Sequence, residues 1–221
     1  MTGVNSSIAQ AHARRARKTR ARLSKVASAR DTIAGFGHHM DVVGLTFGQF
    51  SLLDLIDATL EITGPADVAI ATWSAGFYDV EAAQRFRDSG RIKSIRFVLD
   101  SSAKRGQATV GDIGELFGVE NIRATRSHTK FALITNEEWS VTITSSMNLN
   151  LNPRLEQFEM TDDKERCGMF MQFVDGLFDE LVAGDTGDRH IPELHGLEGV
   201  APATGVAVTR RIATGPLVDA R

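Results

Sequence analysis

Helical and strand-like segments alternate along the middle of the chain, and this alternation restricts the fold more than any other feature. Residues 51–62 place leucine and isoleucine on one helical face behind Ser51, a good N-cap, and end before a Gly-Pro pair. Residues 66–74 and 92–100 are typical of buried strands, whereas residues 80–90 and 109–118 favour helices. We therefore expect an α/β fold with a mixed, largely parallel sheet flanked by helices on both faces.

Three strand-like segments follow in close succession, at residues 122–134, 139–150 and 154–161. Their spacing predicts neighbouring strands, with at least one antiparallel pair joined through a turn at residues 136–138. Residues 167–183 then form an amphipathic pattern whose Met and Phe stripe predicts a helix packed on the core. No internal repeat is visible, so the chain carries one copy of any site.

The two ends of the chain differ from this middle. Residues 11–30 hold eight basic side chains and no acidic one, and their Ala/Arg composition favours a helix over residues 8–30. Of the 25 basic residues 17 remain elsewhere against 28 acidic ones, a formal charge of −11. Residues beyond 184 are rich in Gly, Pro, Ala and Thr without a period. We expect a basic N-terminal arm over 1–34, a folded domain over 35–183 and a flexible tail over 184–221.

The basic arm on an acidic body has two readings. It suits a polyanionic partner, of which nucleic acid is the first candidate, or it is a solubilising, frayed helix. The single cysteine, Cys167, has no CxxC or Cys/His neighbours and favours a reducing compartment without a zinc site. No window has the roughly 18 apolar residues of a membrane span, and no secretory signal follows the basic N-terminus. We therefore expect a cytoplasmic protein.

Polar side chains recur with the period of a strand between residues 128 and 148. His128 and Lys130 share one face of their predicted strand, and Ser146 and Asn148 share one face of the next. If both faces lie on the same side of the sheet, an imidazole, an ammonium, a hydroxyl and a carboxamide converge. This set suits a phosphate group, because Lys, Ser and Asn donate hydrogen bonds and His supplies a nucleophilic nitrogen.

These residues resemble the motif of the phospholipase D superfamily, which runs H-x-K-x4-D, then G-S-x-x-N or G-S-x-N, and usually then N-x-E. Here the matching residues are His128 and Lys130, then Ser146 and Asn148, and then Glu156. The resemblance covers about residues 50–183, as one phospholipase D-like half-domain. It is nearest to short bacterial and phage nucleases that carry one motif and pair two copies in a dimer.

Two positions depart from that motif. The motif aspartate is replaced by Thr135, and the glycine before the motif serine is replaced by Ser145. Strand alternation puts position 135 on the face opposite His128, so the threonine weakens the family match more than the chemistry. A serine in place of glycine narrows the approach of the substrate backbone.

The resemblance implies a two-step phosphodiester transfer that needs no metal and no cofactor. One histidine forms a phosphohistidine, the partner subunit's histidine protonates the leaving group, and water then releases the product. Lys130, Ser146 and Asn148 would hold the phosphoryl oxygens, and Glu156 would accept from the ring N–H of a histidine. The implied protein is a homodimeric DNA endonuclease of a bacterial or phage-infected cell.

Further residues are candidates for holding the substrate, and the function has alternatives. Arg126 could bind a flanking phosphate or form a surface salt bridge, and Asp100, at the end of a predicted strand, could face the ligand crevice or cap a helix or loop. Trp73 and Trp139 could stack on bases or belong to the core. A catalytically silent DNA-binding or complex-organising protein of the same fold is the alternative function, and a lipid phosphodiesterase has less support. The arm residues expected to contact DNA are Arg14, Arg15, Arg17, Lys18 and Arg20.

Overall fold

The computed structural model describes residues 18–23, 28–73, 80–101, 110–149, 151 and 153–185. Eight strands of this part form one sheet with the order β1-β2-β8-β7-β6-β3-β4-β5. The strands are β1 (Lys18–Leu23), β2 (Met40–Thr46), β3 (Ala66–Thr72), β4 (Ile92–Asp100), β5 (Ile122–Thr125), β6 (Phe131–Thr135), β7 (Ser140–Ser145) and β8 (Glu156–Asp162). The helices are α1 (Ala29–Thr32), α2 (Leu52–Thr63), α3 (Val80–Asp88), α4 (Val110–Phe117), the 3-10 helix η1 (Val119–Asn121) and α5 (Lys164–Glu180).

The predicted α/β class is confirmed, but the expectation of a largely parallel sheet is wrong. The pairs β1–β2, β3–β4 and β4–β5 are parallel, whereas the four pairs that join β2, β8, β7, β6 and β3 are antiparallel. The reason is that β6 and β7 are joined by a tight turn, which reverses the chain, instead of by a crossover helix. In that turn Asn136 accepts hydrogen bonds from the backbone N–H groups of Glu138 and Trp139 through its side chain.

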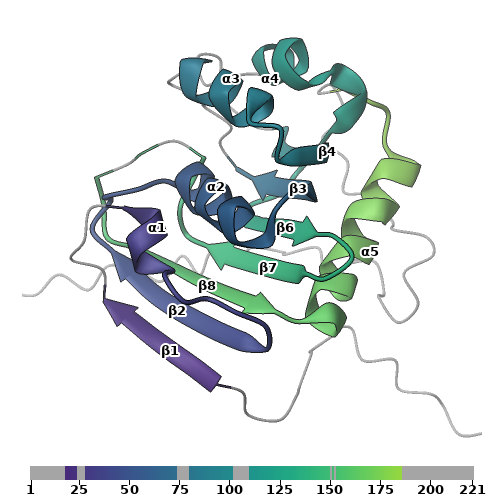
Figure 1. Ribbon diagram of the computed structural model, residues 1–221. Helices are drawn as coiled ribbons and strands as arrows, with labels where there is room; N and C mark the ends of the chain where they lie inside the picture. Colours follow the sequence, from purple (N-terminus) through teal and green to yellow (C-terminus); the bar gives the residue numbers. More distant parts are fainter. Residues whose placement is uncertain are drawn as a thin grey trace, which may run out of the picture.

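Helices cover both faces of the sheet, as predicted. Helices α1 and α2 lie on one face and α5 lies on the other (Figure 1). The core accordingly has two parts: a larger one that contains residues of α1, α2, α3 and α4, and a smaller one that contains Cys167, Val174 and Leu177 of α5. Alternate residues of one strand enter different parts, as Ala132 and Leu133 of β6 do.

Helix α2 shows how local sequence sets an element. Ser51 accepts from the backbone N–H of Asp54, and the Asp54 carboxylate accepts from the backbone N–H of Ser51, which is a capping box. Gly64, with φ of 73°, ends the helix in a backbone conformation that side chains disfavour. Leu52, Leu55 and Ile56 are fully buried on the sheet side.

Two predicted elements are replaced. Residues 18–23, expected within a helix, form β1 and pair in parallel with β2, with Arg20 beside Val42 in the register. Hydrogen bonding to the exposed side of β2 outweighs the helix propensity of this short segment. The single strand expected over residues 122–134 is two strands, β5 and β6, which lie apart in the sheet because β3 and β4 stand between them.

Candidate active site

The candidate site residues lie at one edge of the sheet, where several strands end. The registers pair Ala71 with Phe131, Phe131 with Thr144, and Ser145 with Phe158. The carboxyl ends of β3 and β7 therefore meet the amino ends of β6 and β8. Neighbouring strands are about 4.8 Å apart, so residues that follow or precede these ends come within reach of one ligand.

The segment that carries His128 runs along this edge. Residues 126–130 connect β5 to β6, and the strand order requires them to pass the ends of β4 and β3. At β4, the buried Asp100 accepts a hydrogen bond of 2.8 Å from the backbone N–H of Ser127. At β3, the ring of Trp73 lies 5.6 Å from the ring of His128, with the two planes at 55°. The topology thus explains why His128 is held outside a regular strand.

The same segment is stabilised by its own hydroxyl groups. The backbone N–H of Thr129 donates to Ser127 Oγ at 3.2 Å, and the two hydroxyl groups are 2.7 Å apart. This local turn chemistry competes with a strand ladder, which accounts for the break between β5 and β6. His128 is exposed and Lys130 is half-buried.

Ser145 and Ser146 join three strands at the site. Ser145 N–H donates to the carbonyl of Lys130 at 3.1 Å, which continues the β6–β7 ladder past the strand end. Ser146 Oγ donates to the Glu156 carboxylate and accepts from the backbone N–H of Gln157 at 2.9 Å. The structure therefore places Lys130, Ser146 and Glu156 at the adjoining ends of the neighbouring strands β6, β7 and β8. Among the described residues, no hydrogen bond joins Glu156 to His128.

Asn148 is fixed through its backbone. Its carbonyl accepts from the N–H of Leu52, the first residue of α2, at 3.1 Å, and its neighbours Met147 and Leu149 are buried. The side-chain Oδ1 of Asn148 is buried and has no hydrogen-bond partner among the described residues. An unsatisfied buried acceptor costs about 1–3 kcal/mol, so this side chain has an unmet capacity to bind a donor.

The expected coincidence of the two polar strand faces is wrong. Register pairs point to the same face, and Lys130 stands opposite Ser145, not Ser146. The pairs Leu133–Thr142 and Phe131–Thr144 face α5, while Ala132 and Ile143 face α2. Residues 128–130 and 146–148 reach the same edge of the sheet outside the strands, so strand alternation does not apply to them.

The structure separates the two tryptophans. Trp139 is 7% exposed and packs against Phe36 and His38, with ring centroids 5.9 and 3.8 Å away, so it belongs to the core. Trp73 is 37% exposed beside His128. Sequence reasoning left it undecided and omitted it from the site. The signal that identifies it is its position directly after a buried strand that ends at this edge.

The remaining predicted binding residues lie elsewhere or are not described. Arg126 is exposed in the bend that follows β5, on the same segment as His128. Lys18 and Arg20 lie on β1, whose backbone pairs with β2. Arg14, Arg15 and Arg17 lie outside the described residues, as does the predicted tail from residue 186 onward.

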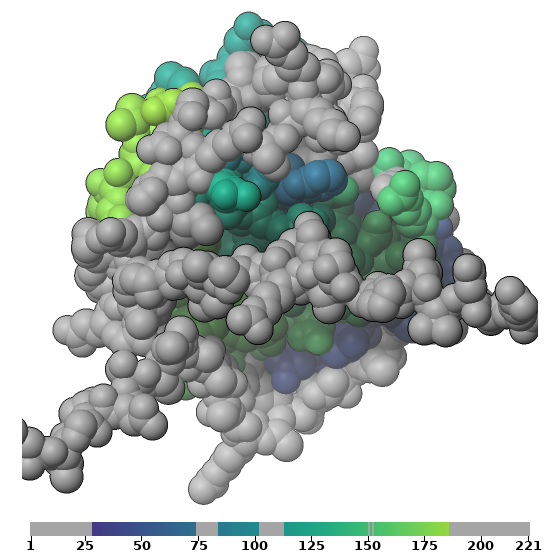
Figure 2. Space-filling model, turned by 180° about the vertical axis from the view of Figure 1, so that it is seen from behind, coloured from purple at the N-terminus to yellow at the C-terminus, as the bar shows by residue number. Residues whose placement is uncertain are grey.

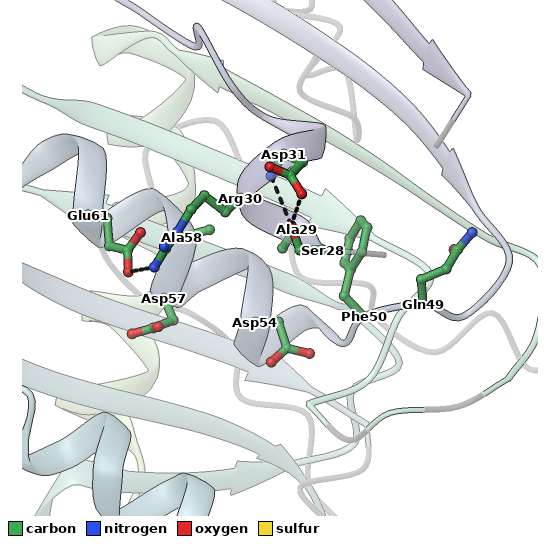
Figure 3. Close-up of a pocket in the computed structure, with 10 residues that line it drawn as sticks. All are labelled: Ser28, Ala29, Arg30, Asp31, Gln49, Phe50, Asp54, Asp57, Ala58 and Glu61. Carbon is green, nitrogen blue, oxygen red and sulfur yellow. Dashed lines mark hydrogen bonds and ion pairs between the residues drawn. The ribbon is translucent and has the colours of Figure 1, made fainter. Parts of the chain in front are cut away.

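A pocket of about 440 Å³ lies between α1 and α2, away from these residues (Figure 3). Its carboxylates are engaged: Glu61 pairs with Arg30, and Asp57 binds Arg91 at 2.8 Å. Burial raises the pKa of the Asp57 carboxyl, against the opposing effect of Arg91. The acidic lining thus joins α2 to α1 through Arg30 and to the start of β4 through Arg91. The described residues include no group of three or more His, Cys, Asp or Glu placed to hold a metal ion.

Comparisons with known proteins give likeness of fold at low similarity. No family model matches the chain, and no curated protein matches it. NucT from Helicobacter pylori is 17% identical over 65% of this chain and 99% of its own, with a TM-score of 0.44. A polyphosphate kinase from Porphyromonas gingivalis is 14% identical, with a TM-score of 0.44, over 62% of this chain and 26% of its own.

TrmBL2, an archaeal chromatin protein, is 11% identical over 66% of this chain and 54% of its own, with a TM-score of 0.38. This chain therefore spans about a quarter of the kinase and about half of TrmBL2. In the part of the chain that the structure describes, no helix is long and apolar enough to cross a membrane.

Proposed function

We propose that the chain is a metal-independent phosphodiesterase, a DNA endonuclease that works as a homodimer through a phosphohistidine intermediate. The observation that carries this proposal is that Lys130, Ser146 and Glu156 lie at the adjoining ends of β6, β7 and β8, at the edge of the sheet along which the segment with the exposed His128 runs. A cation, a hydroxyl, a carboxylate and an imidazole at one edge form a set that can bind and attack a phosphodiester.

In the proposed reaction, a ring nitrogen of His128 attacks phosphorus and the bond from phosphorus to the leaving oxygen breaks. The partner subunit's His128 donates a proton to that oxygen. Water then attacks the phosphohistidine, gives its proton to the partner's His128, and the P–N bond breaks. The cycle thus returns both histidines to their starting protonation states.

Lys130 and Ser146 are proposed to stabilise the negative charge that grows on the phosphoryl oxygens. The Ser146 hydroxyl donates to Glu156 in the free protein, so it would turn from this carboxylate to a bound phosphate. Glu156 itself would repel the phosphate. The Glu156 carboxylate is therefore proposed to accept a hydrogen bond from a histidine N–H and to stabilise the imidazolium form. Asn148 would supply its amide N–H groups to the same phosphate.

A homodimer is proposed because one motif copy provides one histidine, whereas the reaction uses two. Leu151 and Leu155 stand just before Glu156 with exposed fractions of 58% and 65%. Large exposed aliphatic side chains next to a polar site suit a contact with a second copy. A two-fold axis there would bring the two His128 side chains face to face.

The test is the hydrolysis of methyl p-nitrophenyl phosphate and the nicking of plasmid DNA, both with a chelator present. We expect His128→Ala to abolish both reactions. Thr135→Ala is the matched control, since Thr135 pairs with Asp67 and Ser140 at the opposite end of β6. Turnover that requires a divalent cation and persists in His128→Ala would refute the mechanism.

A catalytically silent DNA-binding protein is the second candidate, and one observation favours it. Ser145 stands where the related motif has glycine, and its hydroxyl donates to the Gln157 carbonyl at 2.9 Å and accepts from Met147 N–H at 2.8 Å. These bonds stiffen the site backbone against a substrate. DNA binding without hydrolysis by the wild-type protein, unchanged in His128→Ala, would favour this candidate.

A further inference from the structure

Trp73 is an exposed tryptophan that the core does not use. Its exposed fraction of 37% contrasts with the 7% of Trp139, the other tryptophan of the chain. Tryptophan is highly buried on average, because its large ring gains more than most side chains from leaving water. The indole ring of Trp73, which remains exposed to solvent beside a candidate nucleophile, is therefore a candidate contact for a ligand.

The position of Trp73 follows from the sheet. Trp73 directly follows Thr72, the last residue of β3, and lies two residues beyond Ala71, which pairs with Phe131 at the start of β6. The segment with His128 crosses this strand end, and the two rings lie 5.6 Å apart. Seen from behind, blue atoms from the end of β3 and teal atoms from the segment before β6 lie side by side on the surface (Figure 2).

We infer that Trp73 is a stacking platform for an unpaired nucleobase next to the phosphate that His128 attacks, so that single-stranded DNA is the preferred substrate. This inference rests on the proposed function. A base in a duplex has both faces covered by its neighbours and cannot stack on a side chain unless it leaves the helix. Aromatic platforms bind single strands with little sequence preference, because every base has a π-face.

Charge at the same edge supports a nucleic-acid chain over an apolar partner at this position. Arg126 is exposed on the segment that carries His128, and half-buried Lys130 follows two residues later. A phosphate bound at His128 would thus lie near the cations Arg126 and Lys130 of the connecting segment. A base next to this phosphate could stack on the indole of Trp73. The ring is a positioning group for the substrate and takes no part in bond breaking.

The first experiment measures stacking without catalysis. In a Trp139→Phe background, Trp73 is the only tryptophan, so its fluorescence reports its own surroundings. We expect a ten-nucleotide oligothymidylate to quench this fluorescence. A DNA duplex of ten base pairs should quench it much less. The protein with both Trp73→Phe and Trp139→Phe gives the blank. Equal quenching by duplex and single strand, or none by either, would overturn the inference.

The second experiment measures turnover. Loss of one base–aromatic stack should lower kcat/KM for the oligonucleotide by about 5- to 150-fold in Trp73→Ala. Trp73→Phe should retain most of the activity, and Trp73→Ala should lose much less activity on methyl p-nitrophenyl phosphate, which has no base, than on the oligonucleotide. An abasic residue scanned along the oligonucleotide should reduce wild-type turnover at one position and have no effect there in Trp73→Ala.

Ile62→Ala is the control, because Ile62 is a 36% exposed apolar residue near the end of α2, where the carbonyl of the next residue, Thr63, accepts from Asn136 at the opposite edge of the sheet. We expect it to behave as wild type. A monomeric mass for Trp73→Ala in sedimentation would show that this ring contacts the second copy instead. If the wild-type protein hydrolyses no diester, the proposed function fails, while quenching by single strands still tests the platform.

Discussion

A methyl group at Gly44 should destabilise the sheet measurably. Gly44 of β2 pairs with Phe158 of β8, and a Cβ at Gly44 would overlap Cε1 and Cζ of that ring and lie 2.9 Å from its Cδ1. The ring cannot retreat easily, since Phe158 is fully buried and meets the ring edge of Phe50 with centroids 6.2 Å apart. Overpacking of this kind costs about 1–3 kcal/mol. For a chain of this size, that lowers Tm by about 2–12 °C.

The assay is urea unfolding of Gly44→Ala followed by circular dichroism, with the midpoint compared at constant slope. Gly168→Ala is the control: no atom lies within 4 Å of a Cβ there, and alanine in helix α5 should stabilise by about 0.5–1 kcal/mol. Adding Phe158→Leu to Gly44→Ala should cost less than the two single changes together, since the shorter side chain makes room. A wild-type midpoint for Gly44→Ala would refute the packing argument.

Three further predictions concern the basic N-terminal arm, the buried thiol of Cys167 and the single copy of the site motif. Deleting residues 1–17 removes Arg14, Arg15 and Arg17 but leaves β1; it should lower DNA affinity and reduce the salt slope by about 0.9 for each lost phosphate contact, while diester hydrolysis persists. Equal affinity across a salt series would show that the arm serves another partner. Burial raises the pKa of the Cys167 thiol to about 11, so the folded state keeps this proton where the unfolded chain loses it. Stability should fall as pH rises from about 9 towards 11, and Cys167→Ala should show a smaller fall in its urea midpoint. Sedimentation should give a dimer, and a monomer with full activity would exclude pairing of two His128 side chains.

Much of the fold could be predicted because its elements are locally consistent. The capping box at Ser51 and the apolar stripe of α2 agree with each other, and the buried runs of β3 and β4 match strands. The strand at residues 18–23 could not be predicted, because it forms by pairing with β2. Local propensity carries no information about which neighbour a segment will pair with. The antiparallel centre also depends on long-range pairing, above all that of β2 with β8.

The candidate site could be predicted in its residue types but not in its geometry. His128, Lys130, Ser146 and Glu156 were found by spacing, yet the argument from strand faces was wrong because the chain leaves the ladder at each of the first three. The crossing of residues 126–130 over the ends of β4 and β3 depends on the strand order, which no local pattern encodes. For the same reason the neighbour of His128, Trp73, could not be identified.

The pairing of β2 with β8 also bears on how the chain folds during synthesis. Thr46 pairs with Glu156, a partner that is made 110 residues later. At about 5–20 residues per second, β2 waits about 6–22 s for this neighbour to be made. During that interval, the edge of β2 that later pairs with β8 has no partner strand, and this edge includes Val42 and Leu45. An unpaired strand edge is prone to association with other chains. Fast expression should therefore favour aggregation, and slower synthesis or a chaperone that covers β2 should increase the yield of folded protein.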